Sequence, residues 1–390
     1  MRENTNHWLN YGKLRFSWGQ NGNRDIGQYA ALSNMKTNPL TYIGPDGTVY
    51  TSTYIYVNTM ANNNLRWERT ESYNLGLDFS LFNDIIGGSL EVYSGTTKDL
   101  LVERSLPSIT GFSNVTANLG KLRNKGLELT LNANIFREAN FEWSASSTFS
   151  MNRRKIVALY GDKENVSDEN GNIIGQKESD DPTNGWFIGQ DPDRIWAYDR
   201  IGVWQLGEEE AAAVYGCKPG DFKYKDQNGD GVMNTEDKVF QGYKTPRYRW
   251  SMRNDFTIRK NFTVSFTMYS YFGHYGAFDE AANYNSGAPY KFSSYDMPRW
   301  TKDNPTNDYA RISSYNAGTN WVKKSFLRLD NISVSYNVPK TFLQKFAIQN
   351  MRFTVTARNV AVWSPHWTFW DPENGSLSPR SFNLGINFTL

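Results

Sequence analysis

The sequence lacks any long apolar run. Nowhere does it contain the roughly 18 to 20 consecutive apolar residues that a membrane-spanning helix requires. Hydrophobic residues make up 39% of the 390 residues, and the mean hydropathy is −0.64. These values exclude a helical membrane protein, so only strands could carry this chain across a bilayer.

Cysteine, histidine and excess charge are also scarce. Cys217 is the single cysteine, which excludes an internal disulfide framework and any cysteine-rich metal site. The three histidines, His7, His274 and His366, are too scattered for a zinc site. With 42 basic and 40 acidic residues the net charge is +2, which gives no electrostatic case for nucleic acid or for an acidic substrate.

Signals for export and for catalysis are missing. The first residues have no charged region followed by an apolar region and a cleavage site, so an exported protein would here lack its beginning. There is no G-x-S-x-G elbow, no H-E-x-x-H and no phosphate-binding loop. Asp180 and Asp181 could be imagined as a glycosidase dyad, but two neighbouring acids alone are a weak signal because the dyad depends on a specific carboxyl separation. We therefore predict that the protein is not an enzyme.

What the sequence does contain is strict alternation of apolar and polar residues. The last strand has apolar residues at every second position, with polar residues or glycine between them. These apolar residues are Phe382, Leu384, Ile386, Phe388 and Leu390. A strand with such an apolar face needs a covering layer in a soluble sheet, whereas lipid covers that face in an outer-membrane barrel.

The same alternation recurs along the chain. The apolar residues of these strands are Tyr73, Leu75, Leu77, Phe79 and Leu81; Leu127, Leu129, Leu131 and Ala133; Phe262, Val264, Phe266 and Met268; and Met351, Phe353 and Val355. Charged residues fall on the other face, including Asp78, Glu128, Arg352 and Arg358. That placement favours a membrane barrel, because Arg or Lys on the lipid face near the midplane costs about 2 to 4 kcal/mol.

The connections between strands alternate in length. Short ones lie around Asn83–Gly87, Arg137–Asn140 and Arg259–Asn261, and long ones around Gly19–Thr70, Asp99–Leu119 and Gly273–Ser325. Outer-membrane barrels have short periplasmic turns and long extracellular loops, and counting back from the last strand puts every short turn on the periplasmic side. The connection from Pro339 to Gln349 lands on that side too and contains a predicted short helix over 341–346.

Further local features complete the predicted topology. In the strand that begins at Leu327, the alternation continues only if Asp330 and Asn331 form a β-bulge. Ten strands are clear, and a weaker pair is predicted between Trp186 and Trp204.

The predicted fold class is all-β, a transmembrane antiparallel β-barrel. The alternative is a β-sandwich protein, which also has alternating segments separated by turns. Strands of about ten residues and loops of about fifty residues are longer than usual in soluble domains, and they favour the barrel.

Five collinear segments then carry a resemblance. They are GKLRFSWGQNGN, NLRWERTESYNLGLDFSLFN, TGFSNVTANLGKLRNKGLELTLNANI, KPGDFKYKDQNGDGVMNTEDKVFQG and FLRLDNISVSYNVPKTFLQKFAIQNMRFTVTARNVAVWS. They resemble the C-terminal barrel half of the SusC/RagA family of TonB-dependent outer-membrane transporters, over nearly the whole chain. Leu390 departs from this resemblance, because barrel-assembly signals usually end in an aromatic residue.

The resemblance implies a 22-stranded barrel of which residues 1–390 are the C-terminal part, about 10 to 12 strands. A signal peptide, plug and TonB box are then absent from these residues. We expect long extracellular loops at about 19–70, 98–119, 152–195, 205–248, 273–325 and 362–381.

The resemblance also implies a bacterial outer-membrane location and import of a large nutrient, an oligosaccharide or a peptide. The implied partners are a SusD-like surface lipoprotein, outer-membrane lipid, and the TonB complex through the missing N-terminal part. A passive or adhesive outer-membrane barrel and a soluble β-rich glycan-binding or hydrolytic protein are the alternatives.

One loop has the spacing of a calcium site. In DQNGDGVMNTED the side chains at positions one, three, five, nine and twelve carry oxygen, and the seventh position supplies a backbone carbonyl. These positions are Asp226, Asn228, Asp230, Asn234 and Asp237, with Val232 at position seven. The aspartate at position twelve and the lack of flanking helices predict a structural Ca²⁺ rather than a switch. The alternative is a turn without an ion, because Asn, Asp and Gly also favour turns for their backbone conformation.

Tryptophans near the predicted loops could stack on sugar rings, but aromatic girdles at the two membrane interfaces and loop packing explain most of them. They are Trp186, Trp196, Trp300, Trp321, Trp363, Trp367 and Trp370.

Overall fold

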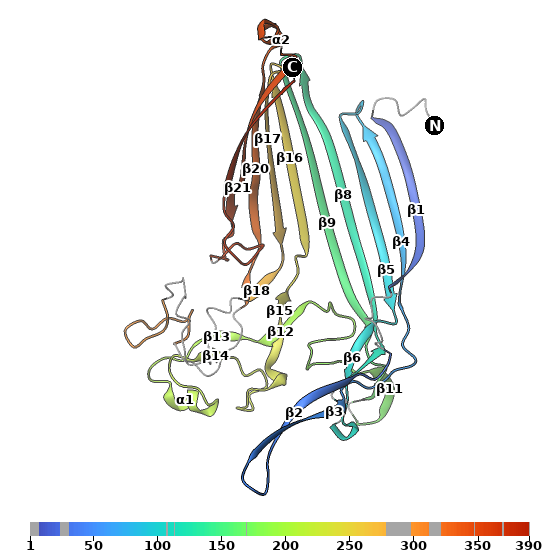
Figure 1. The fold of residues 1–390 in the computed structure, drawn as a ribbon, viewed down its shortest axis with the longest axis vertical. Coiled ribbons are helices and arrows are strands. Elements are labelled where there is room, and N and C mark those ends of the chain that lie inside the picture. Colours follow the sequence, from blue (N-terminus) through green and yellow to red (C-terminus); the bar gives the residue numbers. More distant parts are fainter. Residues whose placement is uncertain are drawn as a thin grey trace.

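The computed structural model describes residues 8–23, 31–106, 108–112, 114–168, 170–277, 298–311, 321–346, 348–368 and 370–389. It is dominated by one ten-stranded sheet in which each strand pairs antiparallel with the next long strand of the chain (Figure 1). The strands are β1 (Leu9–Asn23), β4 (Glu68–Leu81), β5 (Ile86–Lys98), β8 (Lys121–Glu138), β9 (Phe141–Ala158), β16 (Tyr248–Ile258), β17 (Phe262–Phe272), β20 (Phe326–Asn337), β21 (Asn350–Trp363) and β22 (Ser381–Thr389). The predicted all-β fold of ten clear strands is confirmed. Leu390 lies outside the described residues.

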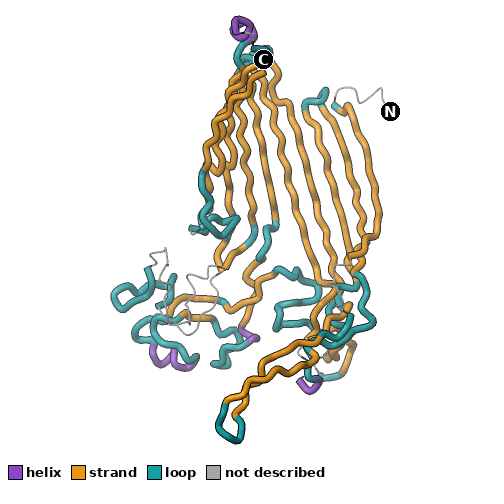
Figure 2. Tube along the Cα trace, in the orientation of Figure 1, coloured by secondary structure: helices purple, strands orange, loops and turns teal. Residues whose placement is uncertain are grey.

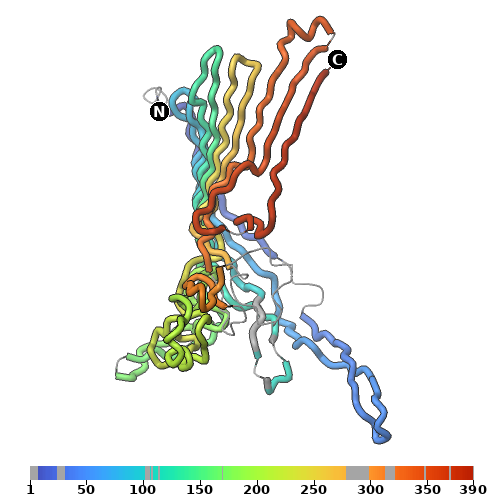
Figure 3. The backbone as a smooth tube through the Cα atoms, turned by 90° about the vertical axis from the view of Figure 1, so that its left-hand side faces the viewer, coloured from blue at the N-terminus to red at the C-terminus, as the bar shows by residue number. Residues whose placement is uncertain are grey.

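The sheet is a single curved layer (Figure 3). Its apolar face is exposed. Phe382 and Leu384 on β22 are 77% and 76% exposed, and Leu75 on β4 is 48% exposed. A soluble sheet with such a face would bury it against a second layer. The observed arrangement suits a wall that lipid covers on one side, because the exposed face is continuous across the strands.

Polar side chains on this apolar face have partners within the face. Trp143 donates its indole N–H to Asn254 at 3.1 Å, and Trp250 donates to the Ser147 hydroxyl at 3.0 Å. Asn254 is only 3% exposed. Hydrocarbon has no hydrogen-bonding groups, so a polar side chain that faces lipid needs a hydrogen-bond partner within the protein.

The two ends of the sheet differ (Figure 2). At one end, here called the turn end, strands are joined by residues 82–85, 139–140, 259–261 and 338–349. At the other, the loop end, they are joined by residues 24–67, 99–120, 159–247, 273–325 and 364–380. The predicted alternation of short and long connections is present.

Two local predictions are confirmed near the turn end and in β20. The register of β20 skips Asp330 against both β17 and β21, which is the predicted bulge. Helix α2 (Lys340–Leu343) and the 3-10 helix η3 (Gln344–Phe346) cover the predicted helical stretch. No helix among the described residues is long and apolar enough to cross a membrane.

The loop end carries small two-stranded sheets and short helices. These elements are β2 (Met35–Ile43), β3 (Val49–Val57), β6 (Leu101–Ser105), η1 (Ser108–Thr110), β7 (Asn114–Asn118), β10 (Lys163–Ser167), β11 (Ile173–Glu178), β12 (Arg194–Tyr198), β13 (Arg200–Val203), α1 (Glu209–Val214), β14 (Phe222–Tyr224), η2 (Thr235–Asp237), β15 (Lys238–Tyr243), β18 (Tyr275–Ala277) and β19 (Trp321–Lys323).

The strand pair predicted between Trp186 and Trp204 exists but does not join the large sheet. It consists of β12 and β13, and these strands pair with β15 and β14 rather than with each other or with the wall. They are too short to span a bilayer, since a tilted spanning strand needs about nine to eleven residues. Residues 159–247 therefore form one long connection instead of two separate loops.

Candidate functional site

The connection 159–247 folds into a small body together with residues 298–311. Val203, Phe222, Trp300 and Ala310 form a buried apolar cluster. Trp300 also donates its indole N–H to Gln205 at 2.7 Å. Two connections that are distant in sequence are thus joined at the loop end.

Gly220 shows why this junction needs a glycine. Its φ is +92°, and a Cβ at this position would lie 2.5 Å from the Trp300 ring. The adjacent Asp221 is 2% exposed and pairs with Arg311 at 2.9 Å. The backbone conformation of Gly220, its close packing on Trp300 and the Asp221–Arg311 ion pair therefore all stabilise the contact between the connection 159–247 and residues 298–311.

The base of the connection is attached to the wall by charge. Asp191 pairs with Arg247, and Asp193 pairs with Arg154 on β9. Asp193 also accepts a hydrogen bond from the Thr245 hydroxyl at 2.8 Å. The Asp193–Arg154 pair attaches the connection to β9, and the other two contacts join residues 191–193 to the end of the connection that leads into β16.

The predicted calcium loop lies between β14 and β15 and forms a compact turn. Asp226 accepts backbone N–H bonds from Gly229 at 2.6 Å and Gly231 at 2.8 Å, and these bonds lower the pKa of its carboxyl despite some desolvation. Tyr215, just after α1, donates its hydroxyl to the same carboxylate at 3.1 Å. Position one of the loop is therefore held as an anion.

The other predicted ligands bond to the same turn. Fully buried Asp237 accepts from the backbone N–H groups of Gln227 at 2.9 Å and Asn234 at 2.8 Å. Asp230 accepts from Val232 at 2.7 Å, and Asn228 donates to Asp230 at 3.1 Å. Within the described residues no group of three acidic, histidine or cysteine side chains is placed to hold a metal. The calcium loop and the turn without an ion use the same residues.

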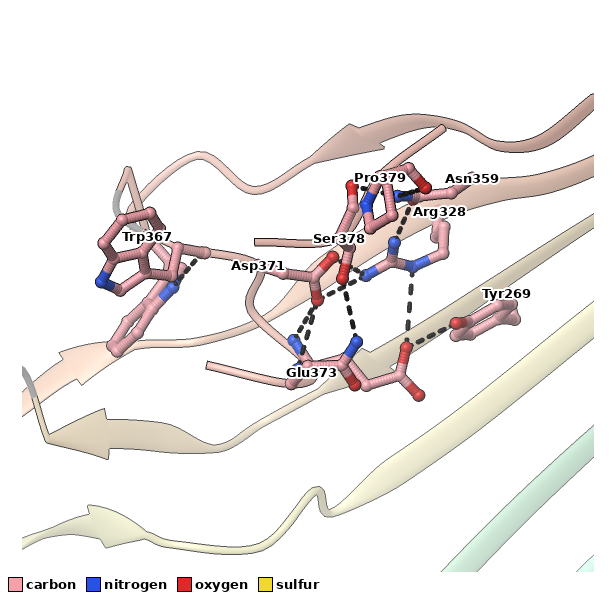
Figure 4. A network of polar contacts seen from close by, with 10 residues as sticks. Tyr269, Arg328, Asn359, Trp367, Asp371, Glu373, Ser378 and Pro379 are labelled. Atoms are coloured by element: carbon pink, nitrogen blue, oxygen red, sulfur yellow. Dashed lines mark hydrogen bonds and ion pairs between the residues drawn. The ribbon is translucent and has the colours of Figure 1, made fainter. Parts of the chain in front are cut away.

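A second candidate site is the loop 364–380, which folds back onto the polar face of the wall (Figure 4). Arg328 on β20 donates two hydrogen bonds of 2.7 Å to the Asp371 carboxylate. Burial raises the pKa of Asp371, but the bonds from Arg328 and from backbone N–H groups outweigh this effect and lower it. Arg328 also contacts Asn359 and lies 3.6 Å from Glu373.

Tyr269 completes this network. It lies directly opposite Arg328 in the β17–β20 register and donates its hydroxyl to Glu373 at 2.5 Å. Asn359 on β21 donates to the backbone carbonyl of Ser378 at 2.8 Å. Three neighbouring strands thus hold one loop against the face that lines the lumen of a closed barrel. Sequence reasoning did not single out Arg328, although it lies between Leu327 and Leu329, on the face opposite these apolar residues.

Two cavities lie beside these loops. One of about 410 Å³ is lined by aromatic and charged residues, among them Tyr275, Tyr309, Trp321, Arg200 and Asp308. The other, of about 370 Å³, lies under the loop 364–380 and is lined in part by Trp367, Trp370 and Asp371. Both linings combine aromatic rings with charged groups.

Most of the tryptophans considered as sugar-stacking residues are explained by packing. Trp300 and Trp367 are each 7% exposed, and Trp196 packs edge-on against Phe187. Trp363 is 67% exposed and shares the lipid face with Leu327 through the β20–β21 register. Trp186 closes a turn by pairing with Asp181.

The polar face of the wall carries a separate charge network. Arg15 pairs with Asp78 at 2.7 Å and with Glu91 at 2.8 Å, which joins β1, β4 and β5. Of the four charged residues predicted to face the lumen, Asp78 belongs to this network. Glu128 lies opposite Glu91 in the β5–β8 register. Arg352 and Arg358 lie on β21 opposite Asn387 and Ser381.

The two neighbouring acids Asp180 and Asp181 cap backbone groups. Asp180 accepts from the N–H of Ile188 at 2.6 Å, and Asp181 accepts from the N–H of Asn184 at 3.0 Å. Asp181 also binds the Tyr160 hydroxyl at 2.8 Å. These contacts give both acids a structural role in the loop.

A single-layer sheet with an exposed apolar face, short turns at one end and long loops at the other defines a wall of an outer-membrane β-barrel. The family model described as TonB dependent receptor-like, beta-barrel matches residues 5–269. The chain belongs to this family, and the predicted outer-membrane location is confirmed.

Curated relatives agree with this assignment. The chain is 30% identical to TonB-dependent receptor P3 of Formosa agariphila, over 96% of this chain and 37% of the relative. It is 28% identical to TonB-dependent receptor SusC of Bacteroides thetaiotaomicron, over 97% of this chain and 37% of the relative. The resemblance to the SusC/RagA group is confirmed. The chain spans between about a third and two fifths of the length of these relatives.

Solved structures show the same fold. The chain superimposes on the RagAB peptide transporter with a TM-score of 0.71 at 20% identity, over 98% of this chain and 41% of that one. The RagAB peptide importer in its open-open state gives a TM-score of 0.72 at 21% identity, over 98% and 40%. The matched relatives are named as receptors and transporters, in agreement with the prediction of a protein that is not an enzyme.

Proposed function

We propose that this chain is the C-terminal part of the barrel of a TonB-dependent importer of large nutrients. The observation that carries the proposal is the loop 364–380, held by Arg328 and Asp371 against the face that lines the lumen. A pore for large solutes needs a rigid wall with structured loops at its mouth. The buried ion pair fixes the loop 364–380 in such a position. The nutrient class is an oligosaccharide or a peptide.

The orientation and the partners are part of the proposal. The loop end would face the outside of the cell, and a SusD-like surface lipoprotein would cover it. Energy would come from the TonB complex through a plug and TonB-contacting segment in the complete protein. The wall itself would supply binding and mechanical support rather than covalent chemistry.

Transport is tested by uptake in the source bacterium. We expect a strain without this gene to lose import of one class of fluorescent oligosaccharide or oligopeptide, and a strain without TonB to lose it equally. Uptake that persists without TonB would indicate the passive barrel instead. An unchanged uptake of both classes in the gene deletion would reject import of these nutrients.

The partner is tested by site-specific photo-crosslinking in intact cells. Ile109 at the loop end is 94% exposed, and Phe342 in α2 at the turn end is 56% exposed, so they form a matched pair. We expect a crosslinker at position 109 to capture a surface lipoprotein and one at position 342 to capture none. Capture at neither position, or at 342 alone, would reject the proposed arrangement.

We also propose that the loop 226–237 binds one structural Ca²⁺. The spacing of Asp226, Asp230 and Asp237 and the backbone bonds that preorganise them support this proposal. Native mass spectrometry should show one calcium that a chelator removes. Asp226→Asn should abolish it, whereas Asp168→Asn, which alters another Asx-type turn, should not. Equal masses with and without chelator would favour the turn without an ion.

A further inference from the structure

Four cationic side chains gather on the lipid-facing side of β8 and β9 near the loop end. In the β8–β9 register Lys125 lies opposite Arg153, and Arg123 lies opposite Lys155. The next pair toward the turn end is Leu127 opposite Met151. Because alternate residues of a strand share a face, the four cations lie on the same side as these two apolar residues. We call them the basic cluster.

The basic cluster lies just beyond the apolar band. On β8 the apolar positions of this face run from Leu127 to Phe136. About ten tilted residues span the roughly 25 Å of hydrocarbon that a barrel crosses. Lys125 and Arg123 therefore fall at the level of the lipid headgroups, where a cation costs only about 0 to 1 kcal/mol rather than the larger midplane cost.

No acidic side chain in the described residues forms an ion pair with any member of the basic cluster. Arg153 is held in place by neutral partners: it donates to the carbonyl of Arg247 at 2.7 Å and lies over the Tyr248 ring at 4.7 Å. The acid Glu71 lies on the same face two strands away, and it pairs with Lys98 and accepts from the Tyr73 hydroxyl. The positive charge is thus uncompensated within the wall.

An apolar groove runs directly below the basic cluster. It has a volume of about 410 Å³, and Lys125 and Arg153 are among the residues that line it. Its apolar lining includes Phe16, Leu75, Val92, Leu127 and Met151. Ser94 lies on the same face, opposite Lys125 and Tyr73, where its small side chain leaves space between larger neighbours. Charged groups at the headgroup level thus adjoin an apolar groove in the apolar band.

We propose that this surface binds a phosphorylated glycolipid of the outer leaflet, with phosphate at the basic cluster and an acyl chain in the groove. A phosphate monoester carries about −1.5 to −2 charges at neutral pH and accepts several charge-assisted hydrogen bonds, which matches two pairs of cations. This inference rests on the proposed orientation, in which the loop end faces the outside and the cluster therefore lies in the outer leaflet. The site does not depend on which nutrient the barrel imports.

The test uses the complete outer-membrane protein, purified in mild detergent and exposed to defined lipids. Native mass spectrometry measures binding of lipid A with two phosphates, of the same lipid without phosphate, and of phosphatidylglycerol. We expect bisphosphorylated lipid A to bind at least about tenfold more tightly than either of the others. Equal binding of the forms with and without phosphate would overturn the proposal, and equal binding of phosphatidylglycerol would overturn its glycolipid assignment.

Variants locate the site. Lys125→Gln with Arg153→Gln should reduce binding of bisphosphorylated lipid A to the level of the form without phosphate. The charge-preserving change Lys125→Arg with Arg153→Lys should retain it, and so should Arg352→Gln with Arg358→Gln on the polar face. Heat-modifiable migration on gels verifies that each variant has folded. Unchanged binding in the first variant, or an equal loss in the Arg352 and Arg358 variant, would refute the site.

Discussion

Arg328 and Asp371 face each other through two hydrogen bonds of 2.7 Å, with side chains that are only 4% and 6% exposed. They are 43 residues apart in the sequence, one in a strand of the wall and the other in a loop. This pair fixes the loop 364–380 to the polar face. Removing one partner of a buried pair leaves an uncompensated charge, and this typically costs about 3 to 5 kcal/mol.

Arg328→Gln should therefore release the loop 364–380. We expect hydrogen exchange in this loop to accelerate by about a hundredfold or more, while strand β9 keeps its protection. Arg253→Gln is the matched control, because Arg253 pairs with Asp255 in a position where it is 57% exposed, and such pairs contribute about 0 to 1 kcal/mol. Equal exchange in both variants would show that the buried pair does not hold the loop.

Asn359 should stabilise the position of the loop 364–380 through both its side chain and its backbone conformation. Its φ is 52°, in the left-handed region, and its side chain contacts Arg328 and the carbonyl of Ser378. Asn359→Gly removes only the side-chain bonds, whereas Asn359→Ala adds about 1 kcal/mol of backbone strain. Protease resistance of the loop should decrease in the order wild type, Asn359→Gly, Asn359→Ala. A glycine variant less resistant than the alanine variant would contradict this order.

Adjacent residues on β8 should respond in opposite ways to a new charge. Leu129 lies on the lipid face near the middle of the strand, and Thr130 lies on the polar face. Leu129→Arg should cost about 2 to 4 kcal/mol and reduce the folded fraction in the outer membrane, because it places a cation in hydrocarbon. Thr130→Arg should fold nearly normally. Heat-modifiable migration measures both, and the reverse result would mean that the faces are assigned wrongly.

His274 should make the loop end sensitive to acid. Burial, with Lys324 and Arg249 adding positive charge nearby, lowers its pKa to about 4, and its Nδ1 has no hydrogen-bond partner among the residues that the structure describes. The unfolded segment binds its proton with a pKa near 6.5, so it takes up protons first as the pH falls. The stability that the loop end gains from holding His274 neutral is therefore fully present above pH 6.5. It is lost progressively between pH 6.5 and 4, by up to about 3 kcal/mol.

We expect hydrogen exchange in β18 and β19, corrected for its intrinsic pH dependence, to show this loss. His274→Phe should remove the pH dependence, because its ring fills a similar volume without binding a proton. His366→Asn should leave it, because His366 is exposed. An acid response that survives in His274→Phe would assign it to another group.

The strands, their faces and the position of the bulge could be predicted from the sequence because they depend on local alternation. Leu75 and Leu77 face one side because Asn74, Gly76 and Asp78 must face the other, and this holds whatever the strand pairs with. The bulge at Asp330 follows from the same rule, since the alternation on β20 is broken only there. The helix near Lys340 and the alternation of short and long connections are likewise local features.

The loop contacts could not be predicted in this way. Trp300 meets Gln205 across 95 residues, and Arg311 meets Asp221 across 90. No period in the sequence relates these positions, because a loop has no regular repeat and its contacts depend on where its ends are anchored. The calcium-type spacing was visible, yet whether its oxygens surround an ion depends on side-chain positions that spacing alone does not set.

The sequence by itself determined which residues share a face of each wall strand, because a period of two assigns every strand residue to one of two faces before any strand has a partner. Only the tertiary structure decided which loop meets which strand, and that the cations of β8 and β9 lie side by side above an apolar groove. The physical reason is range: alternation is fixed by neighbouring residues, whereas pairing and loop closure join groups from distant parts of the chain.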